Sequence, residues 1–416
     1  MISAVKGTQD LIFPDVTAWQ WAEETARKVF ARFGYTEIRT PILEPTELFV
    51  RGIGGETDIV TKEMYTFADR KGRSLTLRPE NTAGVARAVV ERRLHDSPVH
   101  ARLYYIGPQF RYERPQKGRY RQFHQIGVEV LGDHSPGADA EAIAMVVAYL
   151  EELGVLGVEV QVNSVGCPAC RPVYVSALKE ALEPEAGALC GDCRRRLETN
   201  PLRVLDCKVP SCQPHLDGAP SFGDFLCEAC AEHHAGLKAA LAALGVKYAE
   251  RKRLVRGLDY YTRTVFEVTS SALGAQDALL GGGRYDGLLQ QIGGPALPGF
   301  GWALGLERLL MALPKRAEAR LEWLYVAWSG EGTYEVALGL AASLRRQGVA
   351  VVLDHTARSF KASLKRADRM NVRWVALVGE EERASGTYTL KDLASGEQFA
   401  LSLNDLASRL GSETRP

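Results

Sequence analysis

The chain is 416 residues long, which exceeds one ordinary hydrophobic core and indicates two or three domains. Its composition, 46% hydrophobic and 25% charged, is globular. Because 51 basic side chains balance 51 acidic ones, no overall field attracts or repels RNA, and any nucleic-acid contact must come from a local patch.

The N-terminal part of the chain predicts alternating helices and strands. The first ten residues, MISAVKGTQD, contain no apolar core of signal-peptide length, and no apolar run approaches the roughly 18 residues of a membrane span. We therefore expect a cytoplasmic protein. Hydrophobic periodicity predicts helices at 17–33, 47–51, 81–94 and 139–153, and strands at 35–43, 75–78, 103–111, 122–131, 263–269 and 276–281. These strands are enough for an antiparallel sheet.

The predicted strand 122–131 is expected to bury one face and to expose polar side chains on the other. On the polar face Gln125 and Glu129 flank Gly127, whose missing side chain is expected to leave room for a ligand. Phe123 shares that face. The residues ahead of it carry enough positive charge for a polyphosphate: Arg111, Arg114, Lys117, Arg119 and Arg121, with the acidic Glu113 among them. A solvated edge hairpin is the ordinary interpretation of such a charge run, but it does not explain the repeated Gln-Gly-Glu.

All eight cysteines lie between residues 167 and 230, a segment rich in proline and charge. They form two-residue-spaced pairs and one looser pair: Cys167 and Cys170, Cys190 and Cys193, Cys227 and Cys230, and Cys207 with Cys212. Such spacing suits tetrahedral thiolate coordination of zinc. Reduced cysteines without a metal, or disulfides in a hyperthermophile, remain alternatives. The change in composition predicts an insertion over about 169–249.

Further along, a glycine-rich stretch covers 281–287, and the segment after it is expected to form a helix from near Gly301. In that helix Arg308 would share a face with Gly301 and Gly305, which would let a nucleotide approach. The glycine-rich stretch lacks the spacing of a dinucleotide fingerprint, and nothing matches a Walker motif.

A polar segment at 314–320 predicts a domain boundary. Beyond it, apolar runs at 323–327, 350–353 and 374–378 alternate with predicted helices at 333–347 and 358–370, a pattern typical of a small α/β domain. Basic residues follow one side of the second helix: Arg358, Lys361, Lys365, Arg366 and Arg369. Such a face is usually solvated surface, and only in a chain that binds RNA would it be a candidate contact with the RNA backbone.

Three segments carry a resemblance to a known family. Residues 105–131 resemble motif 2 of the class II aminoacyl-tRNA synthetases, in the form found in histidyl-tRNA synthetases. Residues 256–262, RGLDYYT, and 281–287, GGGRYDG, resemble the two signatures peculiar to the histidine enzymes. Residues 33–45 resemble motif 1 and residues 298–313 resemble motif 3, so the resemblance extends from Gly7 to the end of the chain.

The resemblance implies an α+β fold, with a class II antiparallel-sheet catalytic domain over 1–320 and an α/β anticodon-binding domain over 321–416. It implies ligation of histidine to tRNA, with ATP, L-histidine, histidine tRNA and Mg²⁺ as reactants and a homodimer formed through motif 1. Catalysis is assigned to Arg256 and Arg111. The expected histidine-binding residues are Glu80, Asn81, Thr82, Arg111, Gln125, Glu129, Arg256, Tyr260 and Tyr261. The expected ATP-binding residues are Arg111, Glu113, Arg119, Phe123 and Arg308.

Two alternatives belong to other functional classes. A non-catalytic relative serves as a regulatory subunit in histidine biosynthesis, but it lacks the C-terminal domain and usually departs from the histidine signatures. A tRNA-sensing module would lack ATP-binding arginines, whereas Arg111 and Arg308 are present. Arg284 and Asp286 have no assigned role, and the resemblance does not require a metal at the cysteines.

Overall fold

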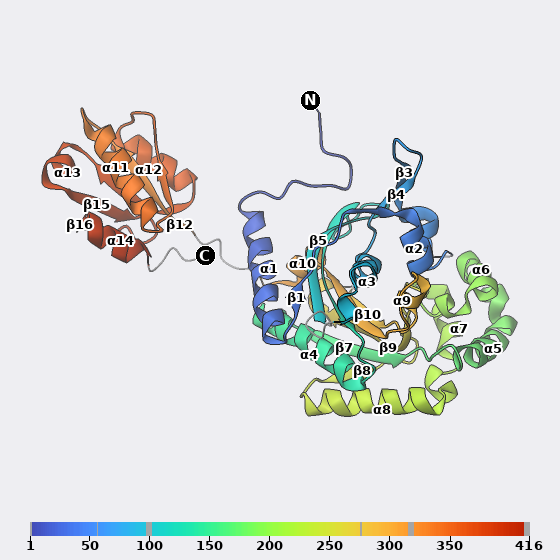
Figure 1. Cartoon of the computed structure of the whole chain (residues 1–416). Coiled ribbons are helices and arrows are strands. Elements are labelled where there is room, and N and C mark those ends of the chain that lie inside the picture. The colour runs from blue at the N-terminus through green and yellow to red at the C-terminus, as the bar shows by residue number, and fades with distance from the viewer. Residues whose placement is uncertain (1, 56, 97–101, 275–276, 315–319, 412–416) are drawn as a thin grey trace. The chain divides into compact units, whose positions relative to one another are not determined.

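The computed structural model describes residues 2–55, 57–96, 102–274, 277–314 and 320–411, which fall into two compact units, Met1–Pro314 and Lys315–Pro416 (Figure 1). The predicted polar boundary at 314–320 lies mostly outside the described residues. No helix in the described part of the chain is long and apolar enough to cross a membrane.

An eight-stranded sheet, in the order β1-β5-β6-β11-β10-β9-β7-β8, organises the first unit. Its strands are β1 (Thr36–Glu37), β5 (Arg102–Phe110), β6 (Gln122–Leu131), β7 (Val158–Ser164), β8 (Tyr248–Glu250), β9 (Thr262–Ser270), β10 (Ala278–Arg284) and β11 (Gly299–Gly305). The six central strands are antiparallel, and the outer β1 and β8 are parallel to their neighbours. A small sheet of β2 (Leu43–Pro45), β4 (Ser74–Leu77) and β3 (Tyr65–Ala68) lies beside it in the same unit.

One face of the large sheet is apolar and covered by helices. The helices that contribute to this core are α1 (Asp15–Arg32), α4 (Pro136–Glu152), α8 (Glu228–Ala243) and α10 (Leu306–Ala312). From β6, Ile126, Val128 and Val130 point into this core. The polar residues of β6 therefore lie on the opposite face, because successive side chains of a strand alternate.

The opposite face of the sheet is bordered by a second core that includes the cysteine segment. The helices here are α3 (Thr82–Glu91), α5 (Arg171–Leu182), α6 (Gly191–Thr199), α7 (Gln213–Asp217) and α9 (Leu288–Gln291). The helix α2 (Thr46–Ile53) packs in a small separate cluster with Ile59 and Ala83. Residues of α3, of the 170–222 segment and of the 260–285 region pack together in it. In Figure 1, α5, α6 and α7 gather at one side of the sheet, while α8 returns beneath it to β8.

The second unit contains a five-stranded sheet in the order β13-β12-β14-β15-β16. Its elements are β12 (Leu321–Trp328), α11 (Thr333–Arg346), β13 (Val351–Leu353), α12 (Phe360–Arg369), β14 (Val372–Val378), α13 (Glu380–Ser385), β15 (Thr387–Asp392), β16 (Gln398–Ser402) and α14 (Leu403–Gly411). β12 is parallel to both of its neighbours, and separate apolar clusters cover the two faces of the sheet. The predicted α/β arrangement is confirmed.

Three predicted elements differ from the structure. The expected strand 35–43 is divided into two pieces on either side of Pro41. Only β1 joins the large sheet, while β2, which begins at Leu43, joins the small sheet. The expected helix from Gly301 is wrong, since β11 continues to Gly305 and pairs along its length with β6 and β10; α10 begins at Leu306. The strand expected at 276–281 is β10, which starts at Ala278, while residue 276 lies outside the described residues.

Candidate active site

Glu129 lies at the centre of the polar face of the sheet and is completely buried. The Thr82 hydroxyl donates to Glu129 Oε1 at 2.7 Å, and the Tyr285 hydroxyl donates to Glu129 Oε2. Burial raises the pKa of Glu129 from its usual 4.5 to about 8, despite the two donated bonds that lower it. Without a ligand the carboxyl is therefore largely protonated and neutral at pH 7. A ligand that compensates the negative charge of the carboxylate would favour its ionised form.

Glycines on β6, β10 and β11 let the site's side chains lie flat on the sheet. A Cβ on Gly301 would fall 1.9 Å from Glu129 Oε2, and a Cβ on Gly281 would fall 2.0 Å from Arg256 Nη2. The same holds for Gly283 beneath Tyr261, at 2.9 Å, and for Gly299 beneath Tyr285, at 2.1 Å. No real Cβ can approach this closely, so each glycine admits one side chain of the site. The glycine-rich stretch thus forms a floor for protein side chains.

Gly127 also makes room for a protein side chain, so the prediction that it leaves room for a ligand is wrong. The space expected to be left for a ligand is taken by Tyr105, whose hydroxyl would lie 2.3 Å from a Cβ at Gly127. These two residues are paired neighbours on β5 and β6. The Tyr105 hydroxyl is buried and has no hydrogen-bond partner among the described residues, and the same is true of Gln125 Oε1 and Arg256 Nε. Such unpaired buried polar atoms are costly unless a polar ligand satisfies them.

Arg256 belongs to a loop that crosses above the floor. Its guanidinium forms an ion pair with Glu267 of β9. Downstream, the Tyr260 and Tyr261 rings lie 4.7 Å apart, and the Tyr260 ring meets Tyr285 edge-on at 5.6 Å. Burial raises the pKa of Tyr261 to about 12, so its hydroxyl stays protonated and can donate. The loop supplies a cation and two phenols to the site around Glu129.

The start of α3 contributes a third element. Glu80 accepts from the backbone N–H groups of Thr82 and Ala83 at 2.8 and 2.9 Å, so its carboxylate caps the helix. Asn81 accepts from the Thr40 hydroxyl at 2.6 Å. The structure therefore gives Glu80 and Asn81 structural bonds, and Thr82 is the member of this group that contacts Glu129.

Positive side chains gather beyond the other end of the β6 polar face. Arg111 donates to the Pro79 carbonyl at 2.8 Å, and its guanidinium lies 5.3 Å from the Phe123 ring centre. Glu113 is within 3.9 Å of Arg111 and 3.5 Å of Arg119. Arg308 donates to the Ala278 carbonyl at 2.8 Å, and burial together with the nearby positive charge of Arg119 lowers its pKa. A cluster of guanidinium groups of this kind is suited to a polyanion.

Arg284 and Asp286, which the sequence left unassigned, have a structural place. Arg284 is fully buried and forms an ion pair with Asp139 of α4, and it donates to the Asp133 and Ser135 carbonyls at 2.9 and 3.2 Å. Asp139 also meets His233 of α8 at 2.9 Å. Arg284 thus joins β10 to the start of α4, and Asp286 is a weaker partner of the same guanidinium, at 3.4 Å.

Comparisons with known proteins identify the family of the chain. A family model described as histidyl-tRNA synthetase matches residues 7–169 and 229–309, and an anticodon binding domain model matches 324–413. A histidine–tRNA ligase of Desulfitobacterium hafniense is 52% identical over 408 residues, covering 97% of this chain and 96% of the relative. One from Solibacter usitatus is 51% identical over 411 residues, covering 99% of each. The chain belongs to the histidyl-tRNA synthetase family.

Solved structures support the membership. The apo histidyl-tRNA synthetase of S. aureus is 36% identical with a TM-score of 0.81, covering 99% of this chain and 100% of that one. A protein from Bacillus halodurans described as an ATP phosphoribosyltransferase regulatory subunit/histidyl-tRNA synthetase is 24% identical, with a TM-score of 0.66 over 91% of this chain and 98% of that one, and shares the fold. The α+β class II fold expected from the resemblance is confirmed.

Sequence reasoning for this family missed two residues of the site. Tyr285 donates a hydrogen bond to Glu129 and meets the Tyr260 ring edge-on, and Tyr105 covers Gly127. Tyr285 lies inside the second histidine signature, so its position there was an available signal. Tyr105 lies two positions before Gly107 on β5, and only the pairing register with Gly127 reveals its place.

Proposed function

We propose that the site around Glu129 binds L-histidine and that the cations beyond Gln125 bind ATP. The observation that carries the proposal is the buried Glu129, held by Thr82 and Tyr285 on a glycine floor in a chain of this family. Histidine presents an ammonium, a carboxylate and an imidazole. Such a ligand can satisfy the unpaired Tyr105 hydroxyl, Gln125 Oε1 and Arg256 Nε.

In this proposal Glu129 and Tyr261 recognise the imidazole, and Gln125 and Thr82, with Glu80 and Asn81 beneath them, border the α-amino group. Tyr260 closes the wall. A site built to hydrogen-bond a substrate rejects analogues that leave its polar groups unpaired. The buried carboxyl of Glu129 gives such discrimination against amino acids that lack a ring N–H.

Activation joins a histidine carboxylate oxygen to the α-phosphorus of ATP and breaks the bond to pyrophosphate. The attacking carboxylate is already ionised at neutral pH, so no base is needed. Arg256 and Arg111 stabilise the charge that develops on the α-phosphate, while Arg308, Arg119 and Glu113 hold the triphosphate with its Mg²⁺ and Phe123 stacks on the adenine. In the second step a ribose hydroxyl at the 3′ end of histidine tRNA attacks the histidyl carbonyl carbon, the bond from that carbon to the phosphate oxygen breaks, and AMP leaves with the hydroxyl proton on its phosphate.

We assign tRNA recognition to the second domain, over 321–416. The basic residues of α12 support this: Lys361, Lys365, Arg366 and Arg369 are exposed, although Asp354 partly engages Arg366, at 3.8 Å, and Arg358, at 2.9 Å. The first domain, 1–320 with its insertion at about 169–249, holds every activation residue. Because tRNA is used in the cytoplasm, we place the protein there.

We also propose a homodimer through motif 1. β1 is an edge strand of the large sheet, and Ile42 and Leu43 in the following segment are 41% and 47% exposed. Exposed apolar side chains beside an unpaired strand edge favour contact with a second copy. The eight cysteines are proposed to bind structural Zn²⁺.

Histidine-dependent exchange of pyrophosphate into ATP, without tRNA, tests the activation step. Exchange with histidine but not with other amino acids is the expected result. An absence of exchange in a folded dimer that binds ATP would contradict the proposed reaction.

A further inference from the structure

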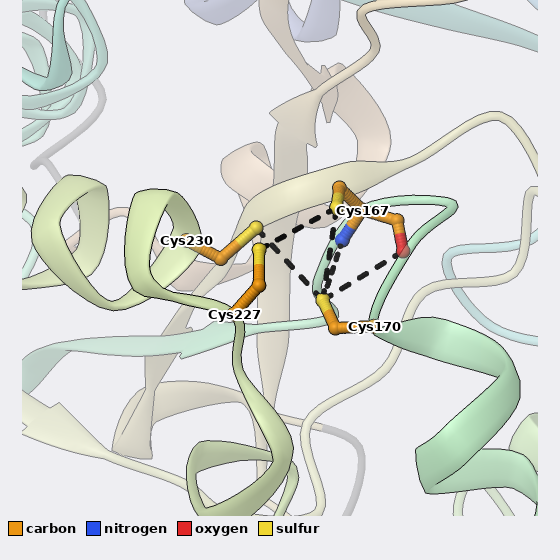
Figure 2. Close-up of side chains that lie close together, drawn as sticks. All are labelled: Cys167, Cys170, Cys227 and Cys230. Atoms are coloured by element: carbon orange, nitrogen blue, oxygen red, sulfur yellow. Dashed lines mark hydrogen bonds between the residues drawn. The ribbon is translucent and has the colours of Figure 1, made fainter.

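The eight cysteines form two separate groups of four. Cys167, Cys170, Cys227 and Cys230 make the first group, and Cys190, Cys193, Cys207 and Cys212 make the second. Within each group all four sulfurs lie within 4.8 Å of one another. Figure 2 shows the first group, with two residues from the turn after β7 and two from the start of α8, all pointing to one centre.

The sulfur spacing fits a tetrahedral ion. Zinc–thiolate bonds are about 2.3 Å long, and four sulfurs at the corners of such a tetrahedron lie about 3.8 Å apart. In the first group Cys167 is 3.8 Å from both Cys227 and Cys170, and Cys170 is 3.9 Å from Cys230. In the second group Cys190 and Cys207 are 4.0 Å apart. All eight cysteines are free of disulfides.

The backbone around the sulfurs is also arranged for thiolates. The N–H groups of Cys193 and Val209 point to the sulfurs of Cys190 and Cys207, both at 3.4 Å, and the N–H of Cys190 points to Cys212 at 3.2 Å. Donors of this kind stabilise a sulfur that carries negative charge. Gly166, at a φ of +60°, leaves room for Cys170, whose sulfur would lie 2.6 Å from a Cβ.

We propose that each group binds one Zn²⁺, and that the two ions hold the histidine-signature loop, residues 256–261, in position. The second part rests on the proposed function. Neither group contains a residue of the active site, so the role of the metals is structural and acts through other residues.

The second group acts through the chain between its ligands. Asn200 and Arg203 lie between Cys193 and Cys207. Arg203 donates to the carbonyls of Arg256 and Gly257, at 3.3 and 2.8 Å, and Asn200 donates to the Asp259 side chain at 3.2 Å. This stretch consists of the end of α6, which reaches Thr199, one turn of 3₁₀ helix at Pro201–Val204, and irregular chain. A short segment of this kind is poorly ordered by itself, and an ion that fixes both of its ends orders it.

The first group reaches the same loop from the other side. Arg171, the residue after Cys170, donates to the Tyr261 carbonyl, and the Gly166 carbonyl accepts from the N–H of Arg263 at 2.7 Å. The residues next to the two cysteine groups thus contact the loop at Arg256, Gly257, Asp259 and Tyr261. The insertion therefore holds the backbone of the loop and the Asp259 side chain, while the Arg256 guanidinium and the Tyr261 ring lie against the sheet.

The metal content tests the first part of the proposal. Native mass spectrometry of the full chain, purified under reducing conditions without added metal, should show two zinc ions per chain. Replacement by Co²⁺ should give the absorption of tetrahedral thiolate sites. The double variant Cys190→Ser with Cys193→Ser should retain one ion. A chain with eight free thiols and no metal, or one with disulfides, would overturn the assignment whether or not the protein exchanges pyrophosphate.

Arg203→Met tests the coupling, with Arg195→Met as its matched control. Arg195 lies on α6 in the same insertion, and its side chain pairs with the exposed Asp192 at 2.8 Å. Arg203→Met should keep two zinc ions but lower kcat/KM for histidine in pyrophosphate exchange about tenfold or more, because it removes two charged hydrogen bonds to the loop. The KM for ATP should change little. Arg195→Met should behave as the parent protein.

Combining Arg203→Met with the Cys190/Cys193 double variant gives a cycle. If the second ion acts through Arg203, the combined loss will be smaller than the product of the separate losses. Fully multiplicative losses, or an Arg203→Met variant with parental exchange, would overturn the coupling while leaving the zinc count standing. Parent protein without exchange would instead contradict the proposed function.

Discussion

The proposed histidine site is built from two regions that are held in different ways. Gln125 and Glu129 are strand residues, fixed by the register of β6 between β5 and β11. Arg256, Tyr260 and Tyr261 belong to a loop, which the insertion fixes through Arg171, Asn200 and Arg203. The strand residues depend on the core of the sheet, which is extensive and apolar. The loop residues depend on a few hydrogen bonds, so they are the part of the site that can be disturbed without unfolding the sheet.

Removing the loop's cation should give the largest effect. Arg256→Ala is expected to lower the rate of adenylate formation by orders of magnitude and to change histidine affinity much less, because a charge that serves the transition state acts mainly on turnover. Single-turnover rates of pyrophosphate release, measured beside histidine binding, separate the two effects. Exchange at nearly the parental rate would remove Arg256 from catalysis.

Displacing the Arg256 side chain from the strand beneath it should have the next largest effect. In Gly281→Ala the new methyl would fall 2.0 Å from Arg256 Nη2, so the guanidinium must move while Glu129 stays in place. A displacement of about 1 Å can cost about a hundredfold in rate. Gly339→Ala, on the exposed side of α11 in the second unit, is the control, since nothing lies within 4 Å of its Cβ position. The contrast would fail if both variants kept the parental kcat/KM for histidine.

Changing the strand residue should act on binding. Glu129→Gln removes a charge-assisted bond to the imidazole, a loss on the order of 1 to 3 kcal/mol in histidine affinity. Titration calorimetry measures this loss directly. Unaltered affinity would place the imidazole elsewhere.

The raised pKa of Glu129 adds a pH signature to the same variant. The folded pKa of about 8 lies above the ordinary value of 4.5, so the folded, ligand-free state binds the extra proton between these values. Stability of the free protein should therefore fall as pH rises from about 4.5 to about 8, and Glu129→Gln should flatten this slope. Binding of an imidazole N–H to the ionised carboxylate releases the proton. Calorimetric enthalpies should then vary with the ionisation enthalpy of the buffer in the parent protein but not in Glu129→Gln.

The sequence predicted the strand half of the site better than the loop half. Alternation along 122–131 places Glu129 on the polar face because the side-chain period of a strand is two, and the structure agrees. The same reasoning predicted that Gly127 leaves room for a ligand. That prediction was wrong because Tyr105 fills the room, and its position depends on how β5 pairs with β6. The same reasoning wrongly placed Gly301 in a helix. A glycine that lies beneath a side chain of a neighbouring strand, as Gly301 lies beneath Glu129, follows no periodicity in the sequence. The hydrogen bond from Arg203 to the Arg256 carbonyl joins residues 53 positions apart, so no local sequence pattern predicts it.

Removing the second unit should have the smallest effect on the first reaction. Every activation residue named above precedes residue 315, and the first unit has its own sheet and cores. Deletion of residues 321–416 is therefore expected to leave histidine-dependent pyrophosphate exchange within about twofold of the parent, while transfer to tRNA falls strongly because the proposed RNA contacts are lost. Both half-reactions are measured on a truncated chain whose folding and oligomeric state match the parent's catalytic unit. If exchange and transfer fell equally in such a chain, the second unit would support the active site, and the loop would have a third support besides the sheet and the insertion.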